Sequence, residues 1–198
     1  MADTTATLAT PHHEEHHEEH HDHEHEHGEN EHSWMNPAAY TQQVQAICEA
    51  LCAIDPSQAT RYRANAQQYR QKIDETGRRL QQIASSLPFD KAVVFHESVA
   101  QTAEALGLTV VGSLPLGEDV GVSAAQVKAV ADAIKGQQVL FFYDAQYAIQ
   151  QETLMSYAAH GEAVVLSSAV LPIDGVADGD VWLYAMEKNI QALKEVAS

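Results

Sequence analysis

The sequence has few positive charges for its length. Its 198 residues contain 11 lysines and arginines against 28 aspartates and glutamates, so the formal net charge is −17. Residues 1–32 hold ten of these acids and no lysine or arginine, and the rest of the chain carries 18 acids against 11 bases. Nucleic-acid binders present basic patches, and anionic membrane surfaces attract basic segments. The composition therefore argues against nucleic acid and against an anionic membrane as partners.

The sequence also lacks a long apolar run, which argues against a membrane-spanning helix. Its first eight residues, MADTTATL, are too polar for a secretory signal peptide. On this ground we expect the chain as given either to stay in the cytoplasm or to belong to a longer exported protein.

Cysteine is scarce, and the common catalytic motifs are absent. Cys48 and Cys52 are four residues apart in a predicted helix and so share one face, where an intrahelical disulfide is awkward. We interpret them as small apolar residues facing the core, with a thiolate metal site as the alternative. The chain has no Gly-x-Ser-x-Gly, Gly-x-Gly-x-x-Gly or Gly-Lys-Ser/Thr motif.

Histidine is the residue in excess. Ten of the 12 histidines fall between His12 and His32, interleaved with nine acidic residues. Neutral imidazole is the commonest protein ligand for divalent transition metals, so such a tract indicates metal binding. A purification tag or a merely solvated acidic tail explains the pattern less well. We predict that residues 1–31 are disordered without metal. The candidate ligands in this tract are His12, His13, His16, His17, His20, His21, His23, His25 and His27.

Two helices are expected next, in a helical linker region over residues 32–87. Asn36 followed by Pro37 is typical of a helix start, and apolar residues at helical spacing continue to about Ile54. Asp55 and Pro56 repeat the start signal. The stretch 57–87 then predicts a helix of about 45 Å, which suggests a structural spine.

Residues 88–198 alternate short apolar runs with helical patterns and predict an α/β lobe. This alternation favours a four-stranded, mostly parallel sheet flanked by helices on both faces. The expected strands cover residues 91–95, 108–111, 138–143 and 163–166. The expected helices cover residues 98–106, 123–135, 146–159 and 181–196.

Polar residues follow the predicted strands at the edge where parallel sheets bind ligands. His96 follows the first strand, Asp144 the third, and Ser167 and Ser168 the fourth. A strand-end histidine is by itself more often structural than a ligand. The position of His96 in a chain with a histidine tract favours a ligand role.

Two further histidines, His32 and His160, do not follow a predicted strand. His32 lies at the junction between the tract and the first helix, where it is a second candidate ligand. His160 is interpreted as a cation partner at a helix C-terminus, without a functional role. A zinc hydrolase using His96 and Glu97 is a weak alternative, because the second histidine of His-Glu-x-x-His is missing.

Three segments together resemble a known family. Residues 31–37 (EHSWMNP) resemble Asp-Pro-His-x-Trp-Leu-Asp-Pro, residues 55–66 (DPSQATRYRANA) resemble Asp-Pro-x-x-Ala-x-x-Tyr-x-x-Asn-Ala, and residues 94–98 (VFHES) resemble Phe-His-Asp-Ala. These motifs occur in the zinc/manganese solute-binding proteins of metal ABC transporters, some of which are called adhesion lipoproteins. The resemblance covers residues 32–198, and the tract before His32 is similar to the His/acid loop of the zinc-specific branch.

The resemblance implies two α/β lobes joined by a long helix, with a metal in the cleft and an extracytoplasmic or periplasmic location. It implies three histidine ligands plus a carboxylate or water, with His32 and His96 as the second and third histidines, and delivery of the ion to a membrane permease. Histidines at both positions favour Zn²⁺ over Mn²⁺.

The departures from the family pattern are as informative as the matches. The N-terminal lobe with the first histidine ligand is missing, so only the linker helix and the C-terminal lobe are expected. Ser167 stands where relatives place a ligating Asp, and the alignment of Asp174 is uncertain. The surface that the missing lobe would cover predicts some self-association. We therefore expect a zinc-binding component of a metal-uptake transporter that lacks one lobe, or alternatively a stand-alone zinc buffer or metallochaperone.

Overall fold

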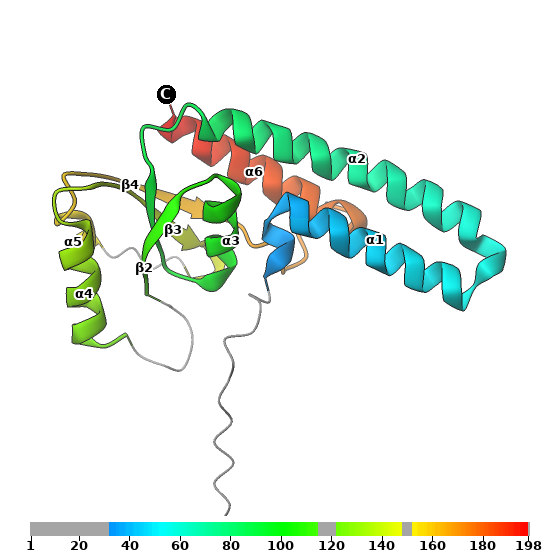
Figure 1. The fold of residues 1–198 in the computed structure, drawn as a ribbon, viewed down its shortest axis with the longest axis horizontal. Coiled ribbons are helices and arrows are strands. Elements are labelled where there is room, and N and C mark those ends of the chain that lie inside the picture. Colours follow the sequence, from blue (N-terminus) through cyan, green and yellow to red (C-terminus); the bar gives the residue numbers. More distant parts are fainter. Residues whose placement is uncertain (1–31, 115–121, 148–151, 198) are drawn as a thin grey trace, which may run out of the picture.

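The computed structural model describes residues 32–114, 122–147 and 152–197. These residues form a helical hairpin and an α/β lobe, and the hairpin extends away from the lobe (Figure 1). Within the described ranges, no helix is both long enough and apolar enough to cross a membrane.

The hairpin consists of α1 (Pro37–Ile54) and α2 (Ala59–Ala84), as the two start signals predict. The Asn36 side chain accepts a hydrogen bond from the backbone N–H of Ala38 at 3.0 Å, which caps α1. Asp55 makes the same contact with Ser57 at 3.1 Å. The residues after this cap form a 3₁₀ turn, η2 (Pro56–Gln58), so α2 begins later and is shorter than predicted. Its 26 residues span about 39 Å.

The lobe is built on a parallel four-stranded sheet, which confirms the predicted fold class. Its strands are β1 (Lys91–Val94), β2 (Thr109–Ser113), β3 (Gln138–Asp144) and β4 (His160–Leu166). They are ordered β2-β1-β3-β4, and every neighbouring pair is parallel. The order reverses between β1 and β3, and ligands bind parallel sheets at the carboxyl ends beside such a switch point.

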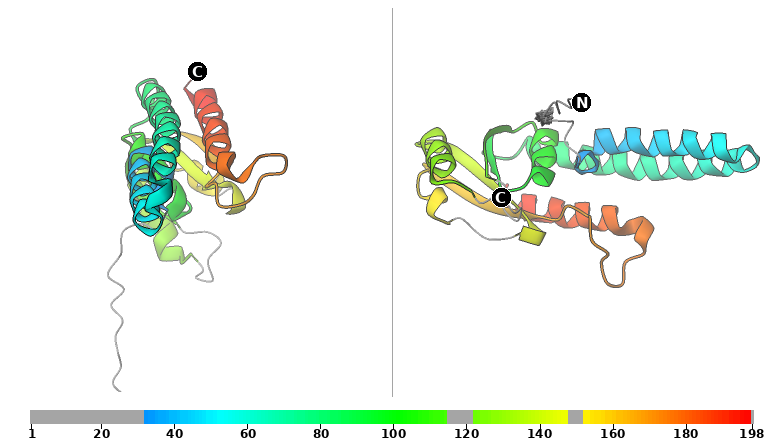
Figure 2. Two further views of the ribbon diagram at one scale, coloured as in Figure 1. Left: turned by 90° about the vertical axis from the view of Figure 1, so that its right-hand side faces the viewer. Right: turned by 90° about the horizontal axis from the view of Figure 1, so that it is seen from below.

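Helices cover both faces of this sheet (Figure 2). On one face, Leu140 and Phe142 of β3 pack in a cluster with residues of α2, α3 (Glu97–Ala105) and α6 (Val181–Val196). On the other, Phe141 and Tyr143 pack with α4 (Ala124–Ile134) and α5 (Glu152–Met155). Successive strand side chains point to opposite faces. Because both faces are covered, the residues of β3 between Gln138 and Asp144 are all apolar or aromatic.

In the part that the structure describes, the helix predicted over residues 146–159 is confirmed only at α5 and is wrong on either side of it. Residues there form a 3₁₀ turn, η3 (Ala145–Tyr147), and the single turn α5, while residues 148–151 lie outside the description. Near the end of the segment, the backbone N–H of Ala159 donates to the carbonyl of Gln137 at 2.8 Å. Sheet pairing therefore takes over from the helix before β4 begins.

His160 is also not at a helix end. It is the first residue of β4, pairs with Gln138 in the sheet, and stacks its ring on Phe89 with centroids 5.4 Å apart. Glu162 lies 3.7 Å from its Nε2 atom. The short apolar run 163–166 concealed the true start of this strand, because the first three residues, His160 to Glu162, carry no apolar signal.

The two cysteines lie in the hairpin. Cys48 is buried between α1 and α2, as a small apolar residue would be, and Cys52 is half-buried with its Sγ 3.7 Å from the carbonyl of Ala59. Both are free thiols. Burial, followed by the neighbouring Cys52 thiol, raises the pKa of Cys48.

Candidate metal site

The structure brings His32 and His96 together, although they are 64 residues apart in the sequence. His96 follows β1 and is the N-cap residue of α3, so it lies at the carboxyl edge of the sheet beside the switch point. His32 directly precedes the 3₁₀ turn η1 (Ser33–Met35), which leads into α1. The two imidazole rings have centroids 5.2 Å apart and meet edge to face at 78°. The sequence placed both residues as candidate ligands and could not show that they meet.

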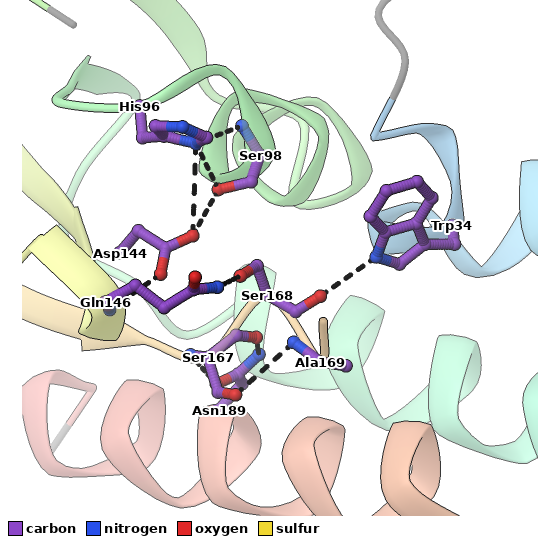
Figure 3. Close-up of polar contacts among 9 residues, drawn as sticks. All are labelled: Trp34, His96, Ser98, Asp144, Gln146, Ser167, Ser168, Ala169 and Asn189. Carbon is purple, nitrogen blue, oxygen red and sulfur yellow. Dashed lines mark hydrogen bonds and ion pairs between the residues drawn. The ribbon is translucent and has the colours of Figure 1, made fainter. Parts of the chain in front are cut away.

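Two tryptophans hold the turn that carries His32. Trp34 donates from Nε1 to the backbone carbonyl of Ser168 at 2.9 Å (Figure 3). Trp182 on α6 donates from its own Nε1 to the carbonyl of Trp34, also at 2.9 Å. The ring of His32 lies 5.2 Å from that of Trp34. The loop after β4 and the last helix therefore fix the position of the His32 backbone.

His96 is held through its Nδ1 atom. This nitrogen lies 2.8 Å from the hydroxyl of Ser98 and 3.1 Å from the backbone N of Ser98. The ring also stacks on Tyr147 of η3 at 4.9 Å and is only 7% exposed. Because Ser98 occupies the Nδ1 side, Nε2 is the nitrogen available to bind a metal.

Asp144, at the end of β3, lies on the Nδ1 side of the His96 ring (Figure 3). Its carboxylate is 1% exposed and accepts from the Ser98 hydroxyl at 2.5 Å and from the backbone N–H of Gln146 at 2.9 Å. Its Oδ2 is 3.9 Å from the Nδ1 of His96. The prediction that Asp144 and His96 share one edge is confirmed. The carboxylate faces the nitrogen that Ser98 contacts and supports the ring from that side.

The position expected for a ligating Asp does not supply a carboxylate. Ser167 exchanges two hydrogen bonds with Asn189 of α6 through its backbone, at 2.8 and 2.9 Å. Its hydroxyl accepts from the backbone N of Ala169 at 3.4 Å. Asp174 is exposed in the loop between β4 and η4 (Asp178–Asp180). Ser167 therefore anchors the loop to α6.

A closed zinc site needs four ligands, and the described residues provide fewer. Over residues 32–114, 122–147 and 152–197, no group of three or more His, Cys, Asp or Glu side chains is placed to hold a metal ion. The tract His12 to His27 lies outside these residues. Glu97, the neighbour of His96, is exposed in the first turn of α3.

Sequence reasoning missed the residues that support the two histidines, namely Trp34, Ser98, Trp182 and Asn189. Ser98 had a local signal, since it follows a strand-end histidine by two residues at a helix start. The indole contacts join positions 134 and 148 residues apart and had no local signal.

Two solved structures share the fold of this chain. The periplasmic zinc binding protein TroA from Treponema pallidum superposes with a TM-score of 0.64 at 20% identity, over 87% of this chain and 66% of that one. A mutant of the laminin-binding adhesin Lmb from Streptococcus agalactiae gives 0.65 at 15% identity, over 84% and 62%. The chain shares with these two proteins a fold with a parallel sheet and a long helix.

The sequence comparison identifies the family. Residues 2–196 match the family described as zinc-uptake complex component A, periplasmic (ZnuA). This chain belongs to that family of solute-binding proteins, whose members are not enzymes. The family assignment removes the support for a hydrolase using His96 and Glu97.

Two curated relatives show how much of the family's length is present. The zinc-binding lipoprotein AdcA of Streptococcus pneumoniae strain R6 is 24% identical over 169 residues, which are 83% of this chain and 33% of that protein. The high-affinity zinc uptake system protein ZnuA of Paracoccus denitrificans is 28% identical over 159 residues, or 80% and 48%. The chain thus spans a third to a half of the length of these relatives.

Proposed function

We propose that this protein captures Zn²⁺ and hands it to the membrane permease of a metal-uptake ABC transporter, outside the cytoplasm. The observation that carries the proposal is the edge-to-face approach of His32 and His96 at the switch point of the sheet. Imidazole nitrogen is a ligand that suits zinc better than manganese, which prefers oxygen. Family membership and the zinc-binding relatives support the same ion.

Capture and release require no covalent chemistry here. Neutral His32 and His96 each offer one lone pair, and a tetrahedral zinc ion would take its remaining ligands from water or from other histidines. A site with few protein ligands holds zinc more weakly than a closed structural site. Such a site is suited to delivery, because the ion has to leave again.

The histidine tract before the fold serves, in this proposal, as a collector. His12 to His27 provide nine imidazoles within 16 residues. Tethered weak sites raise the local metal concentration beside a nearby site. Replacing all nine histidines by asparagine in the full chain is expected to lower the number of zinc ions bound and to leave the circular dichroism spectrum unchanged. Calorimetric titration measures the number bound, and an unchanged number would contradict the collector role.

Single histidine substitutions test the capture site. We expect His32→Gln and His96→Gln each to weaken the tightest zinc site at least tenfold in a competition titration with a chromophoric chelator. His160→Gln is the matched control, because His160 is an exposed histidine of the same lobe that contacts Phe89 and Glu162. Equal zinc affinity in His96→Gln and His160→Gln would contradict the proposed site.

We also infer self-association through the exposed apolar side chains of α1. Ile47 and Ile54 on this helix are 58% and 81% exposed, and Leu51 between them is also exposed. Contiguous exposed apolar surface favours association. A second copy is the occupant that this proposal names, and sedimentation at rising concentration tests it. A monomer at the highest concentration would contradict it.

A further inference from the structure

The two cysteines of α1 line a pocket in the hairpin that is separate from the zinc-capture site. Cys48 and Cys52 are four residues apart, so they lie one turn apart on the same face of the helix. Cys48 is 6% exposed, Cys52 is half-buried, and the Cys52 thiol is within hydrogen-bonding reach of Cys48. Both residues line a pocket of about 570 Å³ between α1 and α2. The hairpin therefore presents two adjacent thiols to one pocket.

Two sulfur ligands without a third define the kind of metal ion that suits this pocket. Within the described part of the chain, no other His, Cys, Asp or Glu joins the two thiols to form a group of three that holds a metal. A structural zinc site needs four ligands. Cu(I) is a soft ion that two thiolates satisfy, and thiolate is a ligand type that selects it. Side chains at this spacing have Cβ atoms about 5–6 Å apart, so both sulfurs reach an ion between them.

The charges around the pocket fit the complex that would form. Each cysteine binds as the thiolate and releases its proton to solvent, so two thiolates with one Cu⁺ carry a single net negative charge. Arg63 and Arg70 of α2 line the same pocket and bring two positive charges, against one negative charge from Glu49. The lining of the pocket therefore has a single net positive charge, which is opposite in sign to that of the ion with its two ligands.

One of these guanidinium groups has an unused donor. Arg70 donates from Nη1 to the side-chain oxygen of Gln45 at 2.7 Å, and Gln45 in turn donates to Glu49 at 2.6 Å. The Nε of Arg70 is buried and has no hydrogen-bond partner among the described residues. A buried donor without a partner is unfavourable. An anionic group in the pocket would lower this cost, which is a second reason to expect a negatively charged occupant.

We propose that Cys48 and Cys52 form a two-coordinate thiolate site for a soft monovalent metal ion, Cu(I), in the hairpin. Both cysteines lie in the second half of α1, whereas His32 precedes the start of that helix, so this site and the zinc-capture site are separate. The hairpin offers sulfur where the lobe offers imidazole nitrogen, and the two ligand types suit different ions. The proposal therefore does not depend on the zinc-capture function.

X-ray absorption at the copper edge tests the ligand set. The full chain is reduced and loaded anaerobically with less than one equivalent of Cu(I), so that the strongest site fills first. We expect two sulfur neighbours around the ion, because thiolate is a softer ligand than the imidazoles of the histidine tract. A wild-type spectrum with only nitrogen or oxygen neighbours would overturn the proposal without any variant.

Variants identify the sulfur atoms. Cys48→Ser and Cys52→Ser should each lose a sulfur neighbour and weaken Cu(I) binding at least tenfold in competition with a chromophoric Cu(I) chelator, because each leaves only one thiolate. Cys48→Ala is a second variant at the buried position, where a serine hydroxyl would lack its water. Circular dichroism verifies that each variant is folded. Unchanged Cu(I) affinity in the folded cysteine variants would overturn the proposal.

Two further comparisons test the charge argument and the separation of the sites. Arg63→Gln should weaken Cu(I) binding by a smaller factor, and Arg63→Lys is the matched control because it keeps the charge. Equal weakening in both would contradict the role of charge. His96→Gln should leave the sulfur neighbours in place, and Cys52→Ser should leave the zinc affinity unchanged. Sulfur neighbours that disappear in His96→Gln would place the copper at the lobe and overturn the proposal.

Discussion

The lobe and the hairpin differ in how far they bury their apolar side chains. In the lobe, Phe141 and Phe142 of β3 are fully buried, each against helices on its own face of the sheet. In the hairpin, Ile47, Leu51 and Ile54 of α1 are exposed, with Ile54 at 81%. Both faces of the sheet are covered, one of them in part by α2 of the hairpin, whereas these side chains of α1 remain exposed in the described part of the chain. Apolar burial is therefore complete at the sheet and incomplete along α1.

The largest expected effect is in the lobe. Phe142→Ala removes a fully buried ring beneath α2, α3 and α6, and should lower the free energy of unfolding by about 3–5 kcal/mol. Urea denaturation followed by circular dichroism measures this loss. A loss below about 1 kcal/mol, the usual size for an average point mutation, would show that the lobe is not the packed core described here.

A smaller effect is expected where the hairpin leaves the lobe. Asn36→Ala removes the side-chain oxygen that accepts from Ala38 at the start of α1, and should cost about 0.5–2 kcal/mol of unfolding free energy. Asn36→Asp keeps a capping oxygen and serves as the control. Equal losses in both variants would mean that the cap does not stabilise this junction.

The ion pair between Arg79 of α2 and Glu187 of α6 ties the hairpin to the lobe at 2.5 and 2.8 Å. The hydrogen bond from Arg79 holds the pKa of Glu187 below its ordinary value of 4.5. The folded state therefore favours the charged form, so the stabilisation is present above the ordinary pKa and is lost as pH falls through the lowered one. Because both groups are partly exposed, it amounts to about 0.2–1 kcal/mol.

Comparing the wild-type chain with Glu187→Gln isolates this contribution. The difference in unfolding free energy should be constant at neutral pH and should shrink as the solution is acidified below the ordinary pKa of the carboxyl. Denaturation at a series of pH values measures it. A difference that grows on acidification would contradict the assigned direction of the pKa shift.

The smallest effect on stability is expected at Ile54, the exposed last residue of α1. Ile54→Gln should change the free energy of unfolding by no more than about 0.5 kcal/mol, because the side chain is already exposed. The same substitution should weaken any self-association, since it removes apolar surface from the proposed contact. A loss of stability comparable to that of Phe142→Ala would remove the distinction between the two regions.

The sequence predicted much of the fold because local signals in many segments agree with the final packing. Buried strands read as apolar runs, Asn36, Asp55 and Ser123 begin helices as expected, and Ser123 forms a reciprocal capping pair with Gln126. Of the helix expected over 146–159, the described residues contain only α5, and its expected end is replaced by backbone bonds from Ala159 and His160 to Gln137. His160 was misplaced because it begins β4 in a stretch with no apolar signal.

The candidate site was predictable only in part. The predicted parallel sheet located His96 and Asp144, because parallel strands all end at the same edge. The approach of His32 depends on indole contacts made by Trp34 and Trp182 across more than 130 residues, which no local pattern encodes. The hydrogen bond from the Ser98 hydroxyl to Asp144 joins a residue that follows β1 to the end of β3, so it could not be predicted before these two strands were paired.

Anomalous diffraction from zinc-loaded crystals of the full chain, recorded on both sides of the zinc absorption edge, tests the central claim most directly. The account predicts a zinc peak about 2.0–2.1 Å from the Nε2 of His96 and within bonding distance of a ring nitrogen of His32. Zinc found only elsewhere on the protein, with no peak beside either imidazole, would contradict it.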